Sequence, residues 1–323
     1  MAKTLISIVM PVYNASQSIH KVIASLLRQT YKNFELIIVN DGSTDETLRI
    51  ISKFKDPRIK VFTYKKNRGI CYALNLGILK SKGEFIARAD ADDKSLSQRL
   101  QKQLSFLTSH PDYDICGTFQ NILRNKKIYK SDTGVTHNEI LTSLVFSSTM
   151  KHSSIMLRKS CLKAFGKNSY RKNFFLCEDY DLWVRLSKHS KFYNLPEYLV
   201  DYEWDTMKSW EKNNDQLDES LKHIYVQVLN NLFFYKVSIK TADIHKALIS
   251  GKFSNLNFFD RFIFLPLHSI SIIFHFFVRK DYCFIRGLKI MIFLYANILS
   301  RKFFNYLGND RSFRLKNFIR EIF

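Results

Sequence analysis

Three aspartates, Asp90, Asp92 and Asp93, follow a short apolar run in the segment FIARADADD. Ionised carboxylates are rarely buried unless they are paired or bound to a metal, so a core strand does not normally end this way. At the exposed carboxyl end of a strand, such oxygens can hold a divalent cation that takes its remaining ligands from water and a substrate phosphate. An acidic turn is the alternative for an isolated cluster.

A second acidic cluster, Glu178, Asp179 and Asp181, lies in FLCEDYDLWVRLSK, where a helix is expected to begin. Acids in a first helical turn can simply complement the helix dipole. A positioned carboxylate can also accept a proton from an attacking hydroxyl, which typically contributes about 10² to 10⁴ in rate. Both interpretations remain open from the residues alone.

The elements that would position the first cluster alternate between strand and helix. Apolar runs predict strands over 5–12, 34–39, 59–64 and 85–89, and helices are expected to run to about residues 29, 55 and 80. This alternation predicts an α/β fold with a doubly wound, mostly parallel sheet. Ligands of such sheets bind beyond the carboxyl ends of the strands.

Four loops therefore meet at one sheet edge in this prediction: Tyr13 with Asn14, then 41–45, 67–69 and 88–93. Each loop alone is compatible with ordinary turn chemistry, but four at one edge predict a shared crevice. The chain has no GxxxxGK[ST] and no GxGxxG segment, so neither a P-loop nor a dinucleotide-binding turn is supported.

Beyond the aspartates, helical periodicity covers 95–108, strand patterns cover 115–128, and KHSSIMLRKS at 151–160 predicts another strand. His152, at the start of that strand, is either a site residue or polar packing. After about residue 209 the strand signals end and helical patterns follow.

Composition narrows the class of protein. The 323 residues carry 50 Lys and Arg against 29 Asp and Glu, a formal net charge of +21, which favours polyanions or an anionic membrane surface as partners. The five cysteines are scattered and form no CxxC pair, which fits a reducing compartment. The first residues lack the pattern of a signal peptide, so a cytoplasmic location is expected.

Four segments in order, SIVMPVYNASQSI, IIVNDGSTDET, NRGICYALNLGI and FIARADADD, closely resemble the family 2 glycosyltransferases. The resemblance covers about residues 5–200. It implies the GT-A fold, a Rossmann-like doubly wound sheet, and an inverting enzyme that uses a UDP-sugar with Mn²⁺ or Mg²⁺.

The resemblance also implies roles for individual residues. Pro11 and Tyr13 would pack on the nucleobase, Asp41 would hydrogen-bond the uracil, Asp90 would contact the ribose or hold the loop, and Asp92 would ligate the metal. Further residues are expected near the donor with less defined roles: Asn14, Asn67, Arg68, Ala91, Asp93 and His152.

On the acceptor side, the resemblance implies that Asp179 is the catalytic base, with Glu178 beside it. Trp183, one helical turn further on, either offers a flat face to a sugar ring or packs in the core. Relatives usually carry an arginine and a histidine soon after a segment like LPEYLVDY, but here Glu203, Trp204 and Asp205 follow. The residue that replaces this histidine is not given by the sequence.

Three segments follow from these patterns: a nucleotide-sugar-binding half at 1–110, an acceptor half with the base at 111–210, and a helical, amphipathic and basic extension at 211–323. Residues 251–323 carry 12 basic and 4 acidic side chains. Phe, Ile and Leu mixed with Arg and Lys indicate a helix that lies in a membrane interface or packs on the domain. A peripheral location on the inner face of the cytoplasmic membrane would suit a lipid-linked acceptor.

The sequence thus predicts transfer of a hexose, such as Gal or Glc, from a UDP-sugar to a glycan acceptor. That acceptor is expected to be linked to undecaprenyl diphosphate, in bacterial O-antigen, capsule or lipooligosaccharide synthesis. One alternative is a sugar nucleotidyltransferase, which would release pyrophosphate. The other is a basic nucleic-acid-binding protein, which would need a basic groove with stacking aromatics; no nucleic-acid partner is expected.

Overall fold

The structure is a computed structural model, and it describes most of the chain. The described residues are 4–174, 176–204, 214–232, 236–250, 264–279, 282–283, 286–288 and 290–292. They fall into two compact units: Met1–Ile140 with Ser148–Leu217, and Leu141–Ser147 with Asp218–Phe323. The predicted half 1–110 belongs to the first unit, as does 111–210 apart from Leu141–Ser147. The main part of the second unit begins at Asp218, near the predicted start of the helical extension.

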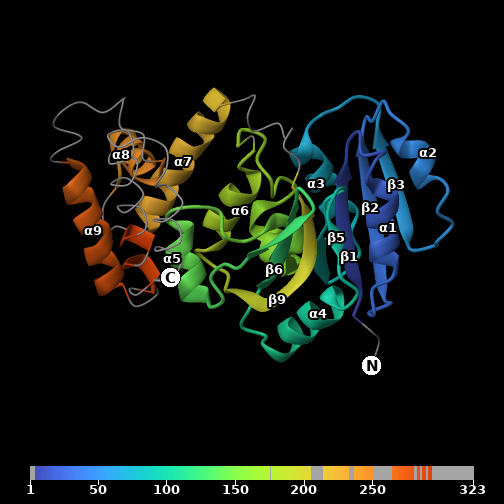
Figure 1. Cartoon of the computed structure of the whole chain (residues 1–323), viewed down its shortest axis with the longest axis horizontal. Coiled ribbons are helices and arrows are strands. Elements are labelled where there is room, and N and C mark those ends of the chain that lie inside the picture. Colours follow the sequence, from blue (N-terminus) through green and yellow to red (C-terminus); the bar gives the residue numbers. More distant parts are fainter. Residues whose placement is uncertain are drawn as a thin grey trace. The chain divides into compact units, whose positions relative to one another are not determined.

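A nine-stranded sheet forms the centre of the first unit, in the order β3-β2-β1-β4-β8-β6-β9-β5, with β7 paired to β6 (Figure 1). The strands are β1 (Ile6–Val12), β2 (Phe34–Asp41), β3 (Ile59–Tyr64), β4 (Phe85–Arg88), β5 (Lys94–Ser95), β6 (Ile115–Arg124), β7 (Lys127–Ser131), β8 (Met156–Arg158) and β9 (Phe192–Glu203). The first four strands are parallel to one another, whereas β8 runs antiparallel to β4 and to β6. The predicted α/β class with a mostly parallel doubly wound half is confirmed.

Helices cover both faces of the parallel strands. α1 (Ile19–Leu27) and α4 (Arg99–Ser109) lie on one face, and α3 (Ile70–Lys80) lies on the other. The first unit also contains α2 (Thr47–Ile51) and α6 (Glu178–Leu186), and α5 (His137–Leu144) begins in it. Buried apolar residues of α1 and α4 share one core cluster with alternate residues of β1 and β2, such as Ile8 and Leu36. The other face of β2, with Ile37 and Val39, packs against Ala73 of α3. Strands buried on both faces explain why these runs are almost continuously apolar.

Two predicted elements are shorter than expected. The second helix was expected to reach about residue 55, but α2 ends at Ile51 because the chain then tightens into turns: Lys53 and Phe54 donate to carbonyls three residues back, and Asp56 accepts the N–H of Arg58. The predicted strand over 151–160 begins only at Met156. His152–Ser154 form a 3₁₀ turn, η1, in which Ser154 N–H donates to Lys151 O.

The second unit is helical in its described part, as expected from the sequence. It contains most of α7 (Asn214–Leu232), together with α8 (Ile239–Ser250) and α9 (Leu265–Val278). His245 of α8 and His268 of α9 are buried and lie 3.1 Å apart between Nδ1 and Nε2. The amphipathic pattern expected over 282–300 lies mainly outside the described residues. Among the helices that the structure describes, none has the length and apolar character needed to cross a bilayer.

Candidate active site

Three loops at the carboxyl edge of the sheet are tied together by hydrogen bonds. Asn14, which follows β1 with a φ of 48°, donates its N–H to Ser43 Oγ (3.0 Å) and accepts the Thr44 N–H on its own Oδ1 (2.8 Å). The carboxylate of Asp41 accepts the N–H groups of Arg68 (2.9 Å) and Gly69 (2.8 Å). The loops after β1, β2 and β3 therefore form one connected rim.

Gly42 allows two of these loops to approach closely. Its φ is +75°, and a Cβ there would lie 2.6 Å from the carbonyl carbon of Lys66 and 2.7 Å from the nitrogen of Asn67. Only glycine fits such a conformation against backbone atoms without a shift. The NDGS turn therefore requires glycine at position 42 for its backbone conformation, whether or not the turn also binds a ligand.

The residues expected around a nucleobase differ in their access to solvent. Tyr13 is 49% exposed at the end of β1, whereas Pro11 is buried within β1 and Asp41 is almost fully buried. The Arg68 guanidinium lies 4.9 Å from the ring centroid of Tyr64 and 4.5 Å from that of Tyr72. Asn67 is exposed beside it. An aromatic side chain and a cation thus border this part of the rim.

The acidic cluster after β4 has the geometry of a cation site. One carboxylate oxygen from each of Asp90, Asp92 and Asp93 lies within 4.8 Å of the others. Asp93 is only 2% exposed and accepts the N–H of Glu203 (3.3 Å), while Ser18 Oγ donates to the carbonyl of Ala91 (2.7 Å). These two bonds hold the backbone at Ala91 and the carboxylate of Asp93 in place. Hard carboxylate oxygens so spaced fit Mn²⁺ or Mg²⁺.

Two buried arginines lie beneath this cluster. Arg88 forms an ion pair with Asp90, and its carbonyl accepts a hydrogen bond from Nη2 of Arg99 (2.7 Å). Arg99 is fully buried, and its Nη1 donates to the carbonyl of Ser153 (2.5 Å). Arg99 thereby joins the end of β4 to the turn that contains His152. Neither arginine had a predicted role, because nothing in the sequence distinguishes a buried arginine from an exposed one.

The predicted base lies in the first turn of α6. Asp179 accepts the N–H of Tyr180 on Oδ1 (2.7 Å) and the hydroxyl of Ser148 on Oδ2 (3.2 Å). Burial raises the pKa of Asp179, and the positive charge of Arg88 opposes that rise. Burial, together with the charge of Asp179, raises the pKa of Glu178 to about 7. Among the described residues, Glu178 Oε2 has no hydrogen-bond partner, which fits a carboxyl group that is protonated near neutral pH.

One cavity of about 290 Å³ brings the two acidic clusters together. Asp90 and Asp179 both line it, although they are far apart in the sequence. The other lining residues are Gln120, Ile122, Ser148, Met150, Lys151, His152, Ser153, Tyr202 and Trp204. Of these, only His152 was predicted. Lys151 and the candidate base Asp179 line the same cavity. Burial lowers the pKa of Lys151, and the charge of Asp179 opposes this shift.

His152 lines this cavity in its neutral form. Its Nε2 lies 2.8 Å from the hydroxyl of Tyr170, and burial together with the charge of Arg88 lowers the pKa of His152 well below its usual value. A neutral imidazole can donate or accept a hydrogen bond at the cavity wall, which is one of the two roles that its sequence position allowed.

Two tryptophans near the site differ in their access to the cavity. Trp183 is fully buried and packs edge-on against His152 at 6.0 Å between ring centroids, so no sugar ring can stack on it in this structure. Of its two predicted roles, the structure supports core packing. Trp204 lines the cavity instead, with the Arg124 guanidinium 5.4 Å from its ring centroid. Asp205, which follows Trp204 in the segment where relatives usually carry a histidine, lies outside the described residues.

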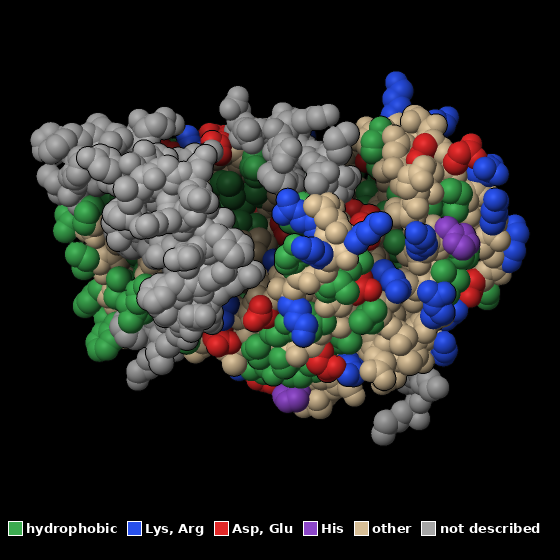
Figure 2. Space-filling model, in the orientation of Figure 1, with side chains coloured by type: hydrophobic (Ala, Val, Ile, Leu, Met, Phe, Trp, Pro, Cys, Tyr) green, Lys and Arg blue, Asp and Glu red, His purple; other side chains and the backbone are tan. Residues whose placement is uncertain are grey.

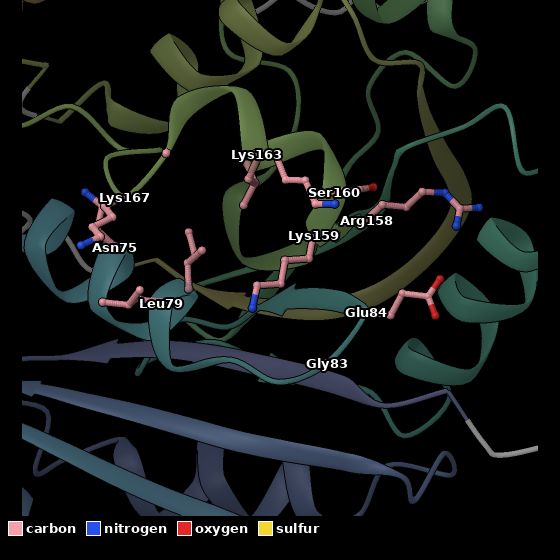
Figure 3. A pocket seen from close by; sticks show the side chains of 12 residues that line it. Asn75, Leu79, Gly83, Glu84, Arg158, Lys159, Ser160, Lys163 and Lys167 are labelled. Atoms are coloured by element: carbon pink, nitrogen blue, oxygen red, sulfur yellow. The ribbon is translucent and has the colours of Figure 1, made fainter.

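A second cavity, of about 440 Å³, is drawn in Figure 3 and shares no lining residue with the first. Gly83 and Glu84, which precede β4, line it together with Lys159, Lys163 and Lys167. It therefore lies at the amino end of β4, whereas the acidic cluster follows the carboxyl end. None of its lining residues belongs to either acidic cluster. Of the two cavities, the smaller one, which Asp90 and Asp179 line, is therefore the candidate active site.

The sheet order, the acidic cluster after β4 and the carboxylate of α6 define a sugar-transferring enzyme with the GT-A fold. Residues 7–169 match the family described as Glycosyl transferase family 2. The chain belongs to this family and is a glycosyltransferase. This membership sets aside the alternatives of a nucleotidyltransferase and of a nucleic-acid-binding protein.

Known proteins similar to this chain agree with that assignment. It is 31% identical over 186 residues to the Escherichia coli UDP-Glc:alpha-D-GlcNAc-diphosphoundecaprenol beta-1,3-glucosyltransferase WfgD, covering 57% of this chain and 70% of that protein. The crystal structure of S. aureus TarS 1–349 in complex with UDP-GlcNAc superimposes with a TM-score of 0.60 at 20% identity, over 84% of this chain and 79% of the TarS 1–349 chain. The Pyrobaculum calidifontis mannosyltransferase PcManGT, in complex with GDP-Man and Mn²⁺, gives 0.59 at 12% identity, over 98% and 83%.

Proposed function

We propose that this glycosyltransferase moves a hexose, with glucose or galactose favoured, from a UDP-sugar to a hydroxyl group of a lipid-linked glycan, with inversion at the anomeric carbon. The acceptor would be a diphosphoundecaprenol-linked sugar of a bacterial surface polysaccharide, and the enzyme would work at the inner face of the cytoplasmic membrane. The printed activity of WfgD supports both the UDP-sugar and the type of acceptor.

The observation that carries the proposal is the shared cavity of Asp90 and Asp179. A donor diphosphate at the acidic cluster would direct its sugar towards the carboxylate of α6. Asp179 is then the group that accepts the proton of the acceptor hydroxyl as that oxygen attacks the anomeric carbon. The bond from the anomeric carbon to the diphosphate oxygen breaks on the opposite side, and UDP leaves with the electron pair.

The chain's own residues would prepare this displacement in three ways. Asp90, Asp92 and Asp93 would hold Mn²⁺ or Mg²⁺, which would neutralise charge on the diphosphate when bound. Lys151 would add positive charge at the cavity wall. Ser148 and the Tyr180 N–H orient the Asp179 carboxylate towards the cavity that Asp179 lines.

The test is transfer to a defined lipid acceptor. Purified enzyme with Mn²⁺ would be given UDP-Glc, UDP-Gal, UDP-GlcNAc or UDP-GalNAc together with a synthetic GlcNAc-diphospho-lipid. We expect UDP release and a disaccharide product with one UDP-hexose, and a β-linkage by NMR if the donor is α-linked. Release of pyrophosphate, or a product that retains the donor's anomeric configuration, would refute the proposal.

A further inference from the structure

Helix α9 has an apolar face that is exposed to solvent. Leu267, Ile270, Phe274 and Phe277 are 56%, 63%, 58% and 73% exposed. Their spacings of three, four and three residues put them on one side of the helix. Figure 2 shows hydrophobic side chains gathered at the left of the view, where α9 lies in Figure 1.

The opposite side of α9 is packed, so this exposure does not arise from a detached helix. Ile272 and Phe276 are 0% and 1% exposed, and His268 contacts His245 of α8. The helix is therefore held in place by one face while the other presents only large apolar side chains. Contiguous exposed apolar surface of this kind usually marks an interaction site.

Positive charge lies at both ends of α9, with Lys240 against Phe264 at the first end and Arg279, which donates to the Asn231 carbonyl, at the last. Leu265–Val278 contains no Lys, Arg, Asp or Glu, but Lys240 Nζ lies 5.2 Å from the ring centroid of Phe264, and Arg279 directly follows the helix. Cations flanking an apolar stripe are typical of helices that lie at a membrane surface.

The length of α9 fits a helix that lies on a bilayer. Its 14 residues span about 21 Å at 1.5 Å per residue, which is shorter than the roughly 30 Å of a hydrocarbon core. A helix of this length can bury its apolar face at the headgroup boundary while it stays parallel to the surface.

Charge decides between a membrane and a second copy of the chain as the occupant. The net charge of +21 would make two copies repel each other, whereas an anionic bilayer would attract each copy. We propose that the α9 face, defined as Leu267, Ile270, Phe274 and Phe277, binds the interface of an anionic membrane. This inference rests on the lipid-linked acceptor of the proposed function and names the surface that would reach it.

Vesicle sedimentation tests the proposal with the full chain. We expect binding to vesicles of phosphatidylcholine and phosphatidylglycerol (3:1), and little binding to phosphatidylcholine alone. The triple variant Ile270→Ser, Phe274→Ser, Phe277→Ser should bind at least about tenfold more weakly, because it lacks three apolar side chains that would be buried in the bilayer. A matched control is Leu79→Ser with Ile128→Ser, two side chains of the first unit that are 56% and 65% exposed. It should bind like the wild type.

Insertion can be measured separately. A tryptophan at Phe277→Trp should be quenched by brominated lipids, whereas one at Val61→Trp, on β3, should not. Transfer to a soluble acceptor analogue reports folding and should be unchanged in the triple variant. If the wild type shows no transfer to any acceptor, the proposed function is refuted. The vesicle-binding measurement would still test the α9 face, because it does not depend on transfer.

Two results would overturn the α9 proposal. One is equal vesicle binding by the triple variant and the wild type. The other is a wild-type dimer in light scattering that becomes a monomer in the triple variant while vesicle binding is unchanged, which would assign the face to a second copy of the chain.

Discussion

The buried Arg88 forms an ion pair with the partly exposed Asp90, and the same guanidinium opposes the rise that burial causes in the pKa of Asp179. One cation thus acts on the acidic cluster of β4 and on the candidate base of α6. Replacement of Arg88 by Met should lower kcat/KM by about tenfold or more and move the acid limb of its pH profile to higher pH, because the pKa of Asp179 rises without the nearby charge. Arg88→Lys, which keeps the charge, should restore the position of the limb. An unchanged profile in Arg88→Met would show that the ion pair is only structural.

Asp179 and Asp181 are two residues apart and should respond differently to substitution. Asp179→Asn removes the proton acceptor and should lower kcat by about 10² to 10⁴, with the affinity for UDP and the thermal midpoint nearly unchanged. Asp181 is fully buried and paired with Arg171 and Arg185, so Asp181→Asn should cost roughly 3 kcal/mol of stability. Titration calorimetry with UDP and thermal unfolding separate the two effects. A kcat in Asp179→Asn close to that of the wild type would contradict the role of base.

Glu178 makes stability depend on pH in a definite direction. Its pKa in the folded state is about 7, above the ordinary value of 4.5, so between these values the folded state binds more protons than the unfolded state. Stability should therefore fall as pH rises through this window. Glu178→Gln cannot ionise and should be more stable than the wild type at pH 8, by about 3 kcal/mol, with no advantage at pH 4. Thermal midpoints of both proteins at the two pH values check the sign.

Metal removal should stop transfer if the acidic cluster holds the cation. We expect EDTA to abolish activity and Mn²⁺ or Mg²⁺ to restore it. Asp92→Asn should raise the half-saturating concentration of Mn²⁺ by about tenfold or more, because a neutral amide is a poorer ligand for a hard cation. Asp45→Asn is a useful control: Asp45 lies on the same rim and accepts N–H groups from Ser16 and Thr47, outside the cluster. Equal Mn²⁺ dependence in both variants would contradict the assignment.

The two tryptophans offer a test of acceptor binding. Trp204 lines the cavity, so Trp204→Ala should raise KM for the acceptor while KM for the UDP-sugar changes little. Trp183 is fully buried, so Trp183→Ala should instead lower stability by about 3 to 5 kcal/mol. Acceptor kinetics and thermal unfolding distinguish them. A normal acceptor KM in Trp204→Ala would remove this residue from the acceptor site.

Local patterns predicted the parallel half of the sheet because β1, β2 and β4 are buried on both faces and are therefore continuously apolar. Ligands of such sheets bind beyond the carboxyl ends of the strands, and this rule correctly predicted that Tyr13, Asp41 and Asp90 lie at one edge of the sheet. Pairing over long sequence distances was not predictable in this way. The parallel pairing of β6 with β9 brings Trp204 to the end of a strand beside the cavity, and no local pattern marks that neighbourhood. Similarly, Lys151 and Arg88 acquire their roles only from burial next to Asp179 and Asp90.

The bonds from Arg68 and Gly69 to Asp41, and from Thr44 to Asn14, tie the loops after β1, β2 and β3 into one rim. The entropic cost of ordering these loops is therefore met during folding and does not weaken ligand binding. If the UDP-sugar binds at this rim, as proposed, it should dock onto backbone that is already ordered.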